Sequence, residues 1–124
     1  MTDKLFLEAT DDTPSVILDS ENQIFEISNR SLPEDPTNFY SPVFKWLENY
    51  SLHPNAITEF HFKMEYFNTA SAKQILKILV LLENLSAQSN LTVHWHFEKG
   101  DWDMKTSGER YSKLVKINFE FIED

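Results

Sequence analysis

Three long segments of the chain alternate between hydrophobic and polar residues, which is the pattern of strands with one buried face. They are predicted over residues 57–67, 91–98 and 115–122. The residues expected on the hydrophobic faces are Phe60, Phe62, Met64, Tyr66, Val93, Trp95, Phe97, Val115, Ile117, Phe119 and Phe121. Strands buried on both faces would instead be continuously apolar. The pattern therefore predicts a sheet with helices on one face and a polar face that meets water or a partner.

Shorter strands are predicted near the start of the chain, over residues 5–8, 14–18 and 24–28. The polar residues 19–22 separate the last two, so these two strands are expected to form a hairpin. Helices are predicted over residues 36–50, 69–88 and about 101–113. Strand–helix–strand connections of this length favour parallel neighbours and right-handed crossovers. The expected architecture is a single two-layer α/β domain over residues 1–124, with a mixed sheet.

Two of the predicted helices leave alternatives open. In the first, Asp35 can cap the helix and Pro36 can occupy its first position. Pro42 then either kinks this helix or marks a second start with Ser41 as the cap. The second helix is apolar around more than one stripe, so it is either a central helix flanked by the other two or partly a protein-binding face. Its apolar residues are Ile75, Leu76, Ile78, Leu79, Val80, Leu81, Leu82 and Leu85.

Composition then removes several classes of function. The formal net charge of −9 argues against nucleic acid and against anionic membranes as ligands. With no cysteine and only two glycines, thiol chemistry and Gly-rich phosphate loops are excluded. The sequence shows no secretory signal and no apolar run long enough to span a membrane, so a cytoplasmic protein is expected. No cofactor, no metal and no catalytic residue is predicted.

A histidine group keeps one chemical alternative open. His94 and His96 share one strand face, and His61 is expected on the same face of a neighbouring strand. Such a group can bind zinc or copper, and would make the chain a small metal-binding or enzymatic α/β domain. Any polar sheet face with alternating residues gives the same spacing, so a solvated or partner-contacting face explains it equally.

The junction of a predicted strand and helix, residues 65–73, is the other candidate. A helix start offers free backbone N–H groups and the positive end of the helix dipole, which together hold a phosphate well. Asn68, Thr69 and Ser71 place an amide and two hydroxyls there. Ordinary capping by Asn68 or Thr69, with Ser71 and Gln74 at capping-box spacing, accounts for the same residues.

Several blocks of the sequence resemble the SiaC family of bacterial regulatory phosphoproteins. They are residues 7–10, 12–16, 25–34, 66–73 and 119–123, so the resemblance covers nearly the whole chain. The most specific block is Tyr-Phe-Asn-Thr at residues 66–69. The family often has glycine where this chain has Asn29, and asparagine tolerates the left-handed backbone that a turn there needs.

The resemblance implies a non-enzymatic partner switch centred on one threonine. A dedicated protein kinase would phosphorylate Thr69, and a PP2C-type phosphatase would remove the phosphate. The unmodified form would bind and activate a diguanylate cyclase, which raises cyclic di-GMP and favours biofilm or aggregation. Asn68, Ser71 and Lys73 are the nearest expected partner contacts, with Glu65 more distant. An interaction domain without modification is the third reading.

Overall fold

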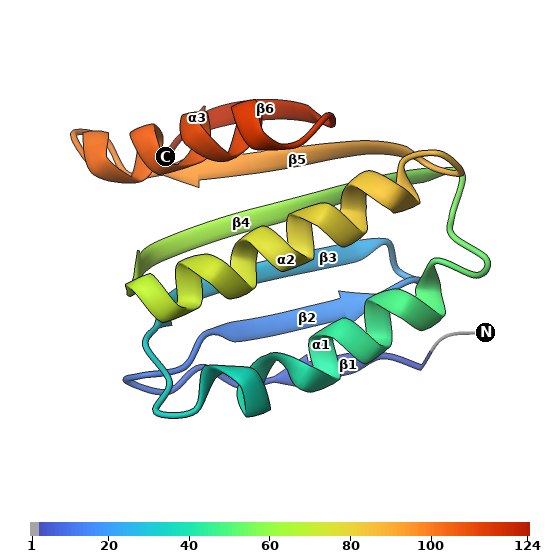
Figure 1. Cartoon of the computed structure of the whole chain (residues 1–124), viewed down its shortest axis with the longest axis horizontal. Helices are drawn as coiled ribbons and strands as arrows, with labels where there is room; N and C mark the ends of the chain where they lie inside the picture. Colours follow the sequence, from blue (N-terminus) through green and yellow to red (C-terminus); the bar gives the residue numbers. More distant parts are fainter. Residues whose placement is uncertain (1–2) are drawn as a thin grey trace.

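The computed structural model describes residues 3–124, whose strands form one mixed sheet in which spatial order follows chain order, β1-β2-β3-β4-β5-β6 (Figure 1). The strands β1, β2 and β3 pair antiparallel, and β3 to β6 pair parallel. Their bounds are β1 Leu5–Leu7, β2 Ser15–Asp19, β3 Ile24–Ser31, β4 Ile57–Phe67, β5 Asn90–Phe97 and β6 Asn118–Glu123. The expected hairpin is the β2–β3 pair, which is joined through residues 20–23.

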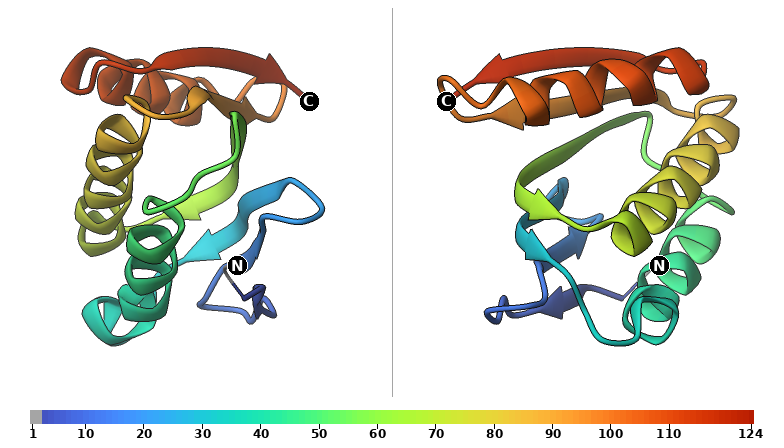
Figure 2. Two further views of the ribbon diagram at one scale, coloured as in Figure 1. Left: turned by 90° about the vertical axis from the view of Figure 1, so that its right-hand side faces the viewer. Right: turned by 60° about the vertical axis from the view of Figure 1, so that its left-hand side comes forward.

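Three helices connect the four parallel strands and lie on one face of the sheet (Figure 2). They are α1 Pro36–Tyr50, α2 Thr69–Leu85 and α3 Trp102–Leu114. Each crossover moves one strand further in the same direction, so crossovers of one hand place all three helices on the same side. The predicted two-layer α/β architecture with a mixed sheet is confirmed.

The first helix settles the question that Pro42 raised. The helix α1 continues through Pro42, so a separate start at Ser41 is wrong. Asp35 is the cap, and its carboxylate accepts a hydrogen bond from the Asn38 N–H at 3.2 Å. Pro36 takes the first position, where a missing N–H costs nothing.

Three element ends differ from the sequence prediction by three residues. The strand β3 continues to Ser31 instead of ending at Ser28. The helix α2 stops at Leu85, where residues 86–88 form a turn of small and polar residues instead of a further helical turn. The last strand begins at Asn118, three residues later than predicted. Val115 is buried because it follows α3 directly and packs into the core, so its burial comes from the helix layer and not from a strand.

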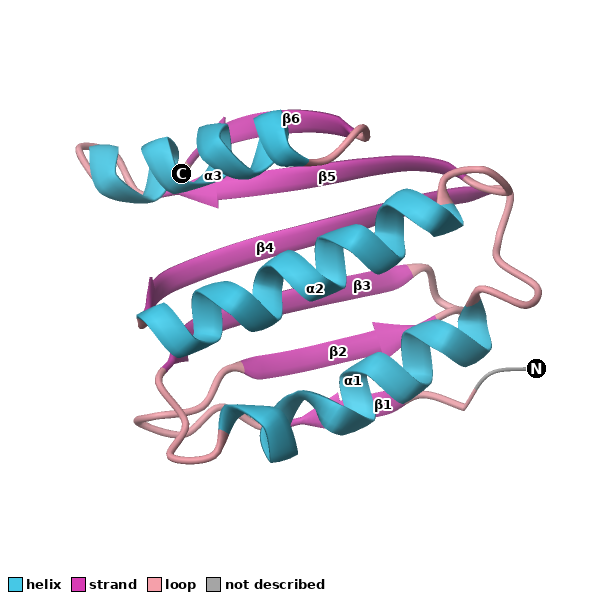
Figure 3. Cartoon of the chain, viewed as in Figure 1, coloured by secondary structure: helices cyan, strands magenta, loops and turns pink. Residues whose placement is uncertain are grey.

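The second helix is the central one of the three (Figure 3). Ile75, Ile78, Leu79 and Leu82 are fully buried between the sheet and the neighbouring helices, as the first of the two interpretations predicts. Val80 remains 43% exposed on its outer side. At 17 residues, neither α2 nor any other helix within residues 3–124 combines the length and the apolar composition of a membrane span.

Candidate functional site

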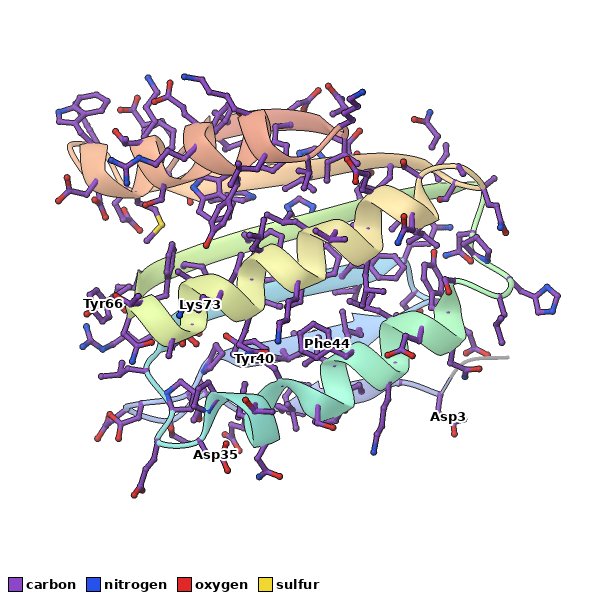
Figure 4. All side chains as sticks on the ribbon, in the orientation of Figure 1. Asp3, Asp35, Tyr40, Phe44, Tyr66 and Lys73 are labelled. Carbon is purple, nitrogen blue, oxygen red and sulfur yellow. The ribbon has the colours of Figure 1, made fainter. Side chains whose placement is uncertain are left out.

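The candidate site lies where the parallel strands β3, β4 and β5 end, at the left-hand edge of the sheet in Figure 1. The chain leaves β4 at Phe67 and enters α2 at Thr69. Only Asn68 separates the two elements, so the helix start is held directly against the sheet edge. Figure 4 shows Tyr66 and Lys73 beside this start, with Tyr40 on the neighbouring helix α1.

Asn68 caps the helix with three hydrogen bonds. Its side-chain oxygen accepts from the Ser71 N–H at 2.9 Å, and its carbonyl accepts from the Ala72 N–H at 2.9 Å. Its own N–H donates to the Ser31 carbonyl at 3.1 Å, which ties the cap to the end of β3. Of the two predicted caps, Asn68 is therefore the one used, and Thr69 is left in the first helical position.

A buried chain of hydroxyls lies beneath this cap. Ser31 Oγ donates to Ser71 Oγ at 2.8 Å, and it lies 2.5 Å from the Tyr40 hydroxyl. Because the single Ser31 proton goes to Ser71, the Tyr40 hydroxyl must donate to Ser31. Burial raises the pKa of Tyr40, although its bonds to Ser31 and Ser71 partly oppose that rise. The chain joins β3, α1 and α2 and keeps its protons at neutral pH.

This burial corrects one sequence-based expectation. Ser71 is fully buried, so it is not a direct partner contact in this structure. Its hydroxyl and its backbone N–H are both engaged within the molecule. Ser71 stabilises the position of the helix start and leaves recognition to its exposed neighbours.

The third helix fixes the other side of the helix start. The Tyr111 hydroxyl donates to the Ala72 carbonyl at 2.8 Å, which holds α3 against the first turn of α2. Burial, with a smaller contribution from Tyr40, raises the pKa of Tyr111, so this donor also stays protonated. The first turn of α2 is thus attached to β3, α1 and α3 at once.

Thr69 is exposed on this fixed start. Its side chain forms no hydrogen bond to any residue between 3 and 124. It borders a cavity of about 340 Å³ between the start of α2 and α3. The cavity is lined by Phe67, Asn68, Thr69, Ala72, Ser107, Arg110, Tyr111 and Leu114. The hydroxyl is therefore accessible to a modifying enzyme, on a helix start that hydrogen bonds attach to neighbouring elements.

The other expected contacts divide between two faces. Lys73 is exposed on α2, one helical turn after Thr69, outside the lining of this cavity. Glu65 is exposed near the end of β4 and borders a separate hollow of about 250 Å³ together with Asp101 and Asp103. The hollow near the start of α3 is therefore acidic, whereas Arg110 gives the adjoining cavity beside Thr69 a positive charge.

The predicted polar face of the sheet carries the histidines, but it is less open than the alternation suggested. His94 and His96 are only 9% and 8% exposed. The rings of His61 and His94 stack with centroids 4.5 Å apart, and His61 Nδ1 lies 2.9 Å from His96 Nε2. Carboxylates close the cluster at its rim, with Glu59 3.1 Å from His94 Nε2 and Asp124 3.1 Å from His96 Nδ1. The two β5 histidines are therefore buried within the polar face instead of being open to water.

Most of the histidine contacts are made within the cluster, although His94 Nδ1 forms no hydrogen bond within residues 3–124 and lies 3.6 Å from a Glu120 oxygen. The His61–His96 contact needs one of its two nitrogens to be unprotonated, so the pair carries at most one shared proton. Burial lowers the pKa of His61, and the neighbouring His94, His96 and Lys63 lower it further, against an opposing effect of Glu26. Within residues 3–124, no group of three or more histidines and acids is arranged to hold a metal ion.

A second cavity, of about 510 Å³, lies on this face and is larger than the one beside Thr69. His96, Asp124, Lys63 and Asn29 are among its lining residues. Asn29 has a φ of 77°, which is the left-handed backbone expected at a position where the family often has glycine. The register between β3 and β4 shifts directly after this residue. Two of its charged groups already have partners, since Lys63 pairs with Glu26 and His96 with Asp124, whereas Glu65 and Glu98 add negative charge to the cavity lining.

Sequence reasoning missed the residues that frame the helix start from other elements. Ser31, Tyr40 and Tyr111 come from β3, α1 and α3. Met104, Gly108 and Tyr111 are the buried residues of α3 at helical spacing, so burial of Tyr111 was open to prediction. Nothing in the local sequence places Arg110 beside Thr69, because that proximity depends on how α3 packs.

Nearly the whole chain is similar to known proteins. An uncharacterized protein of Pseudomonas aeruginosa strain UCBPP-PA14 is 26% identical over 121 residues, which are 97% of this chain and 88% of that protein. The crystal structure of apo-SiaC from Pseudomonas aeruginosa superposes with a TM-score of 0.87 at 21% identity, covering 97% of this chain and 98% of that chain.

A further crystal structure, of the diguanylate cyclase SiaD in complex with its activator SiaC from Pseudomonas aeruginosa, contains a chain with a TM-score of 0.89 at 21% identity. The match covers 97% of this chain and 99% of that chain. At this identity the structural likeness establishes the fold. The model of the SiaC family of regulatory phosphoproteins matches residues 7–124. The chain therefore belongs to the SiaC family of regulatory phosphoproteins.

Proposed function

We propose that this chain is a non-enzymatic, single-domain regulatory phosphoprotein of the cytoplasm, switched by reversible phosphorylation of Thr69. A dedicated protein kinase adds the phosphate and a PP2C-type phosphatase removes it. The unphosphorylated form binds and activates a diguanylate cyclase, which raises cyclic di-GMP and favours biofilm or aggregation. The observation that carries the proposal is the exposed Thr69 hydroxyl at the first position of a helix that three other elements hold in place.

The chemistry of the modification suits this position. Thr69 Oγ1 attacks the γ-phosphorus of ATP, the bond to the ADP oxygen breaks, and the hydroxyl proton passes to a base of the kinase. The product gains about 1.5 to 2 negative charges at a helix N-terminus, where free N–H groups and the dipole favour an anion. The fold is therefore expected to survive phosphorylation, and the change falls on the surface that a partner would touch.

The choice of target is supported by a relative. A SiaC of Pseudomonas aeruginosa activates the diguanylate cyclase SiaD in a complex. Asn68 and Lys73 flank Thr69 on the accessible surface, so a target that covers Thr69 would contact them as well. A phosphate at Thr69 would then occupy the interface and weaken the complex by steric and electrostatic conflict.

The geometry of the histidine cluster supports the metal-binding or enzymatic alternative less well than Thr69 supports the switch. A metal-binding or enzymatic role for His61, His94 and His96 needs free ring nitrogens around a common point. Instead, His61 bonds to His96, His96 also bonds to Asp124, and His94 stacks on the His61 ring and bonds to Glu59. No observation in the described part of the chain favours this role over the switch.

The experiment combines phosphorylation with a matched threonine. The protein is incubated with a candidate protein kinase and ATP, and the phosphate is located by mass spectrometry. Thr37 is the control, because it is also an exposed threonine in the first turn of a capped helix. Thr37→Ala is expected to keep the label and Thr69→Ala to lose it. A label that persists in Thr69→Ala would overturn the proposal.

Target binding is tested with the modified protein itself. Unmodified protein is expected to bind the cyclase and increase cyclic di-GMP synthesis, whereas stoichiometrically phosphorylated protein is expected to do neither. Equal binding by both forms would show that Thr69 is modified without switching this partner.

A further inference from the structure

We infer that Arg110 receives the phosphate of phosphorylated Thr69, so that modification locks the start of α2 to α3. This inference rests on the proposed function, since it describes the state that phosphorylation creates. It concerns an arginine that the sequence analysis did not single out. The two residues lie on different elements and border the same cavity.

Arg110 reaches this cavity from α3, and Thr69 reaches it from α2. The Tyr111 hydroxyl bonds to the Ala72 carbonyl at 2.8 Å, so the side chain next to Arg110 in the sequence contacts the first turn of α2. Arg110 itself is exposed, and it forms no ion pair with any acid among residues 3–124. An arginine with an uncommitted fork of donors can form two parallel hydrogen bonds to a phosphate.

The charges around Thr69 favour one direction for the phosphate, toward Arg110. An adjoining hollow between the end of β4 and the start of α3 contains Glu65, Asp101 and Asp103, all of which would repel a phosphate and leave the Arg110 end of the cavity as the favoured direction. The cavity beside α3 contains Arg110 and no acid. Lys73, one turn along α2, is the competing cation, but it lies outside this cavity and offers a point charge in place of a fork.

The consequence is a structural difference between the two forms. Without the phosphate, Thr69 and Arg110 are both available to a partner. With it, the guanidinium offsets part of the phosphate charge, and the phosphate occupies part of the cavity between α2 and α3. Phosphorylation would thus remove the Arg110 charge from the interaction surface in addition to placing a phosphate at Thr69.

The test installs phosphothreonine at position 69 during translation, through an expanded genetic code, so no kinase is needed. The second ionisation of the phosphate is followed by ³¹P NMR in the full chain. Arg110→Gln is expected to raise this pKa by about half a pH unit or more, because it removes the neighbouring cation. Lys113→Gln removes one exposed charge from the same helix and is expected to leave it unchanged.

Two further variants make the result decisive. Arg110→Lys keeps the positive charge but loses the two parallel donors of the guanidinium. Its phosphate pKa is expected to lie between those of the unsubstituted protein and of Arg110→Gln. An unchanged phosphate pKa in Arg110→Gln would overturn the inference, as would a larger rise in Lys73→Gln. These outcomes are independent of the kinase assay, so failure of the phosphate contact and failure of the phosphorylation proposal are distinguishable.

Discussion

The helix start at Thr69 and the histidine cluster on the opposite face are both concentrations of polar side chains, yet they differ in what they leave free. At the helix start, the buried groups Ser31, Tyr40 and Ser71 satisfy one another and leave the Thr69 hydroxyl exposed. In the histidine cluster, the rings are stacked and paired with one another and with rim acids. Only the first arrangement combines a rigid base with an accessible reactive group.

The difference shows why a count of chemically capable residues misleads. Three histidines with several acids outnumber one threonine, but His94 and His96 are buried and each is bonded to a rim acid, and His61 is bonded to His96. A single hydroxyl on an immobile helix start is better placed for a modifying enzyme. The predictions that follow test whether burial and hydrogen bonding, more than residue type, separate the two regions.

The largest difference in stability is expected between two aspartate substitutions in the first turn of α2, one at Ser71 and the other at Thr69. Ser71→Asp would bury a carboxylate beside Ser31 and Tyr40, and should lower the free energy of unfolding by on the order of 3 kcal/mol or more. Thr69→Asp places the same charge in the exposed first turn, where the helix dipole favours it by about 0.3–1 kcal/mol. Urea unfolding followed by circular dichroism measures both variants.

Similar stabilities for these two variants would contradict the comparison. It would mean that the first turn of α2 opens enough for Ser71 to reach water, and that the helix start is not rigid. Thr69→Asp is also expected to remain folded but to lose its binding to the cyclase.

The sequence predicted the elements well and the site only in part. Alternation and helical spacing located all nine elements, because a one-sided sheet leaves a clear period of two in β4 and β5. The junction was found because capping residues and the family block coincide there. Tyr40, Tyr111 and Arg110 could not be assigned to it, since their roles arise from helix packing over long sequence separations.

The second prediction concerns the packing of α3, which borders the Thr69 cavity. A Cβ at Gly108 would overlap the buried Trp95 indole. Gly108→Ala is therefore expected to destabilise by about 1–3 kcal/mol from overpacking, less the roughly 1 kcal/mol by which alanine favours a helix. Glu109→Ala, on the exposed side of the same helix, should change stability by less than about 0.5 kcal/mol.

The same variant distinguishes the two regions. Trp95 lies between His94 and His96 in β5, but its ring points to the helices and donates to the Met104 carbonyl at 2.9 Å. A shift of α3 should therefore change the NMR signals of Tyr111 and Thr69 more than those of the His61 ring. The reverse order would mean that the helix start does not depend on α3.

The third prediction removes the cap. Asn68→Ala loses the side-chain bond to the Ser71 N–H and should cost about 1 kcal/mol. Asp35→Ala removes the corresponding cap of α1 and should cost a similar amount. Only the Asn68 variant is expected to slow phosphorylation of Thr69, which a timed kinase assay would show. Equal phosphorylation rates in both variants would show that the Asn68 cap is not needed to position the Thr69 hydroxyl for the kinase.

The smallest effect is expected from the histidine cluster and depends on pH. Because the pKa of His61 is lowered in the folded protein by burial, His94, His96 and Lys63, against Glu26, the unfolded chain binds its proton more readily. The stability of the folded state is then complete above the unfolded pKa of about 6.5 and declines as pH falls toward the lowered value. His61→Asn should flatten this decline between about pH 7 and 5 in urea unfolding, whereas His53→Asn, in an exposed turn, should not. An unchanged decline in His61→Asn would show that the cluster is open to water, which would revive its claim to a functional role.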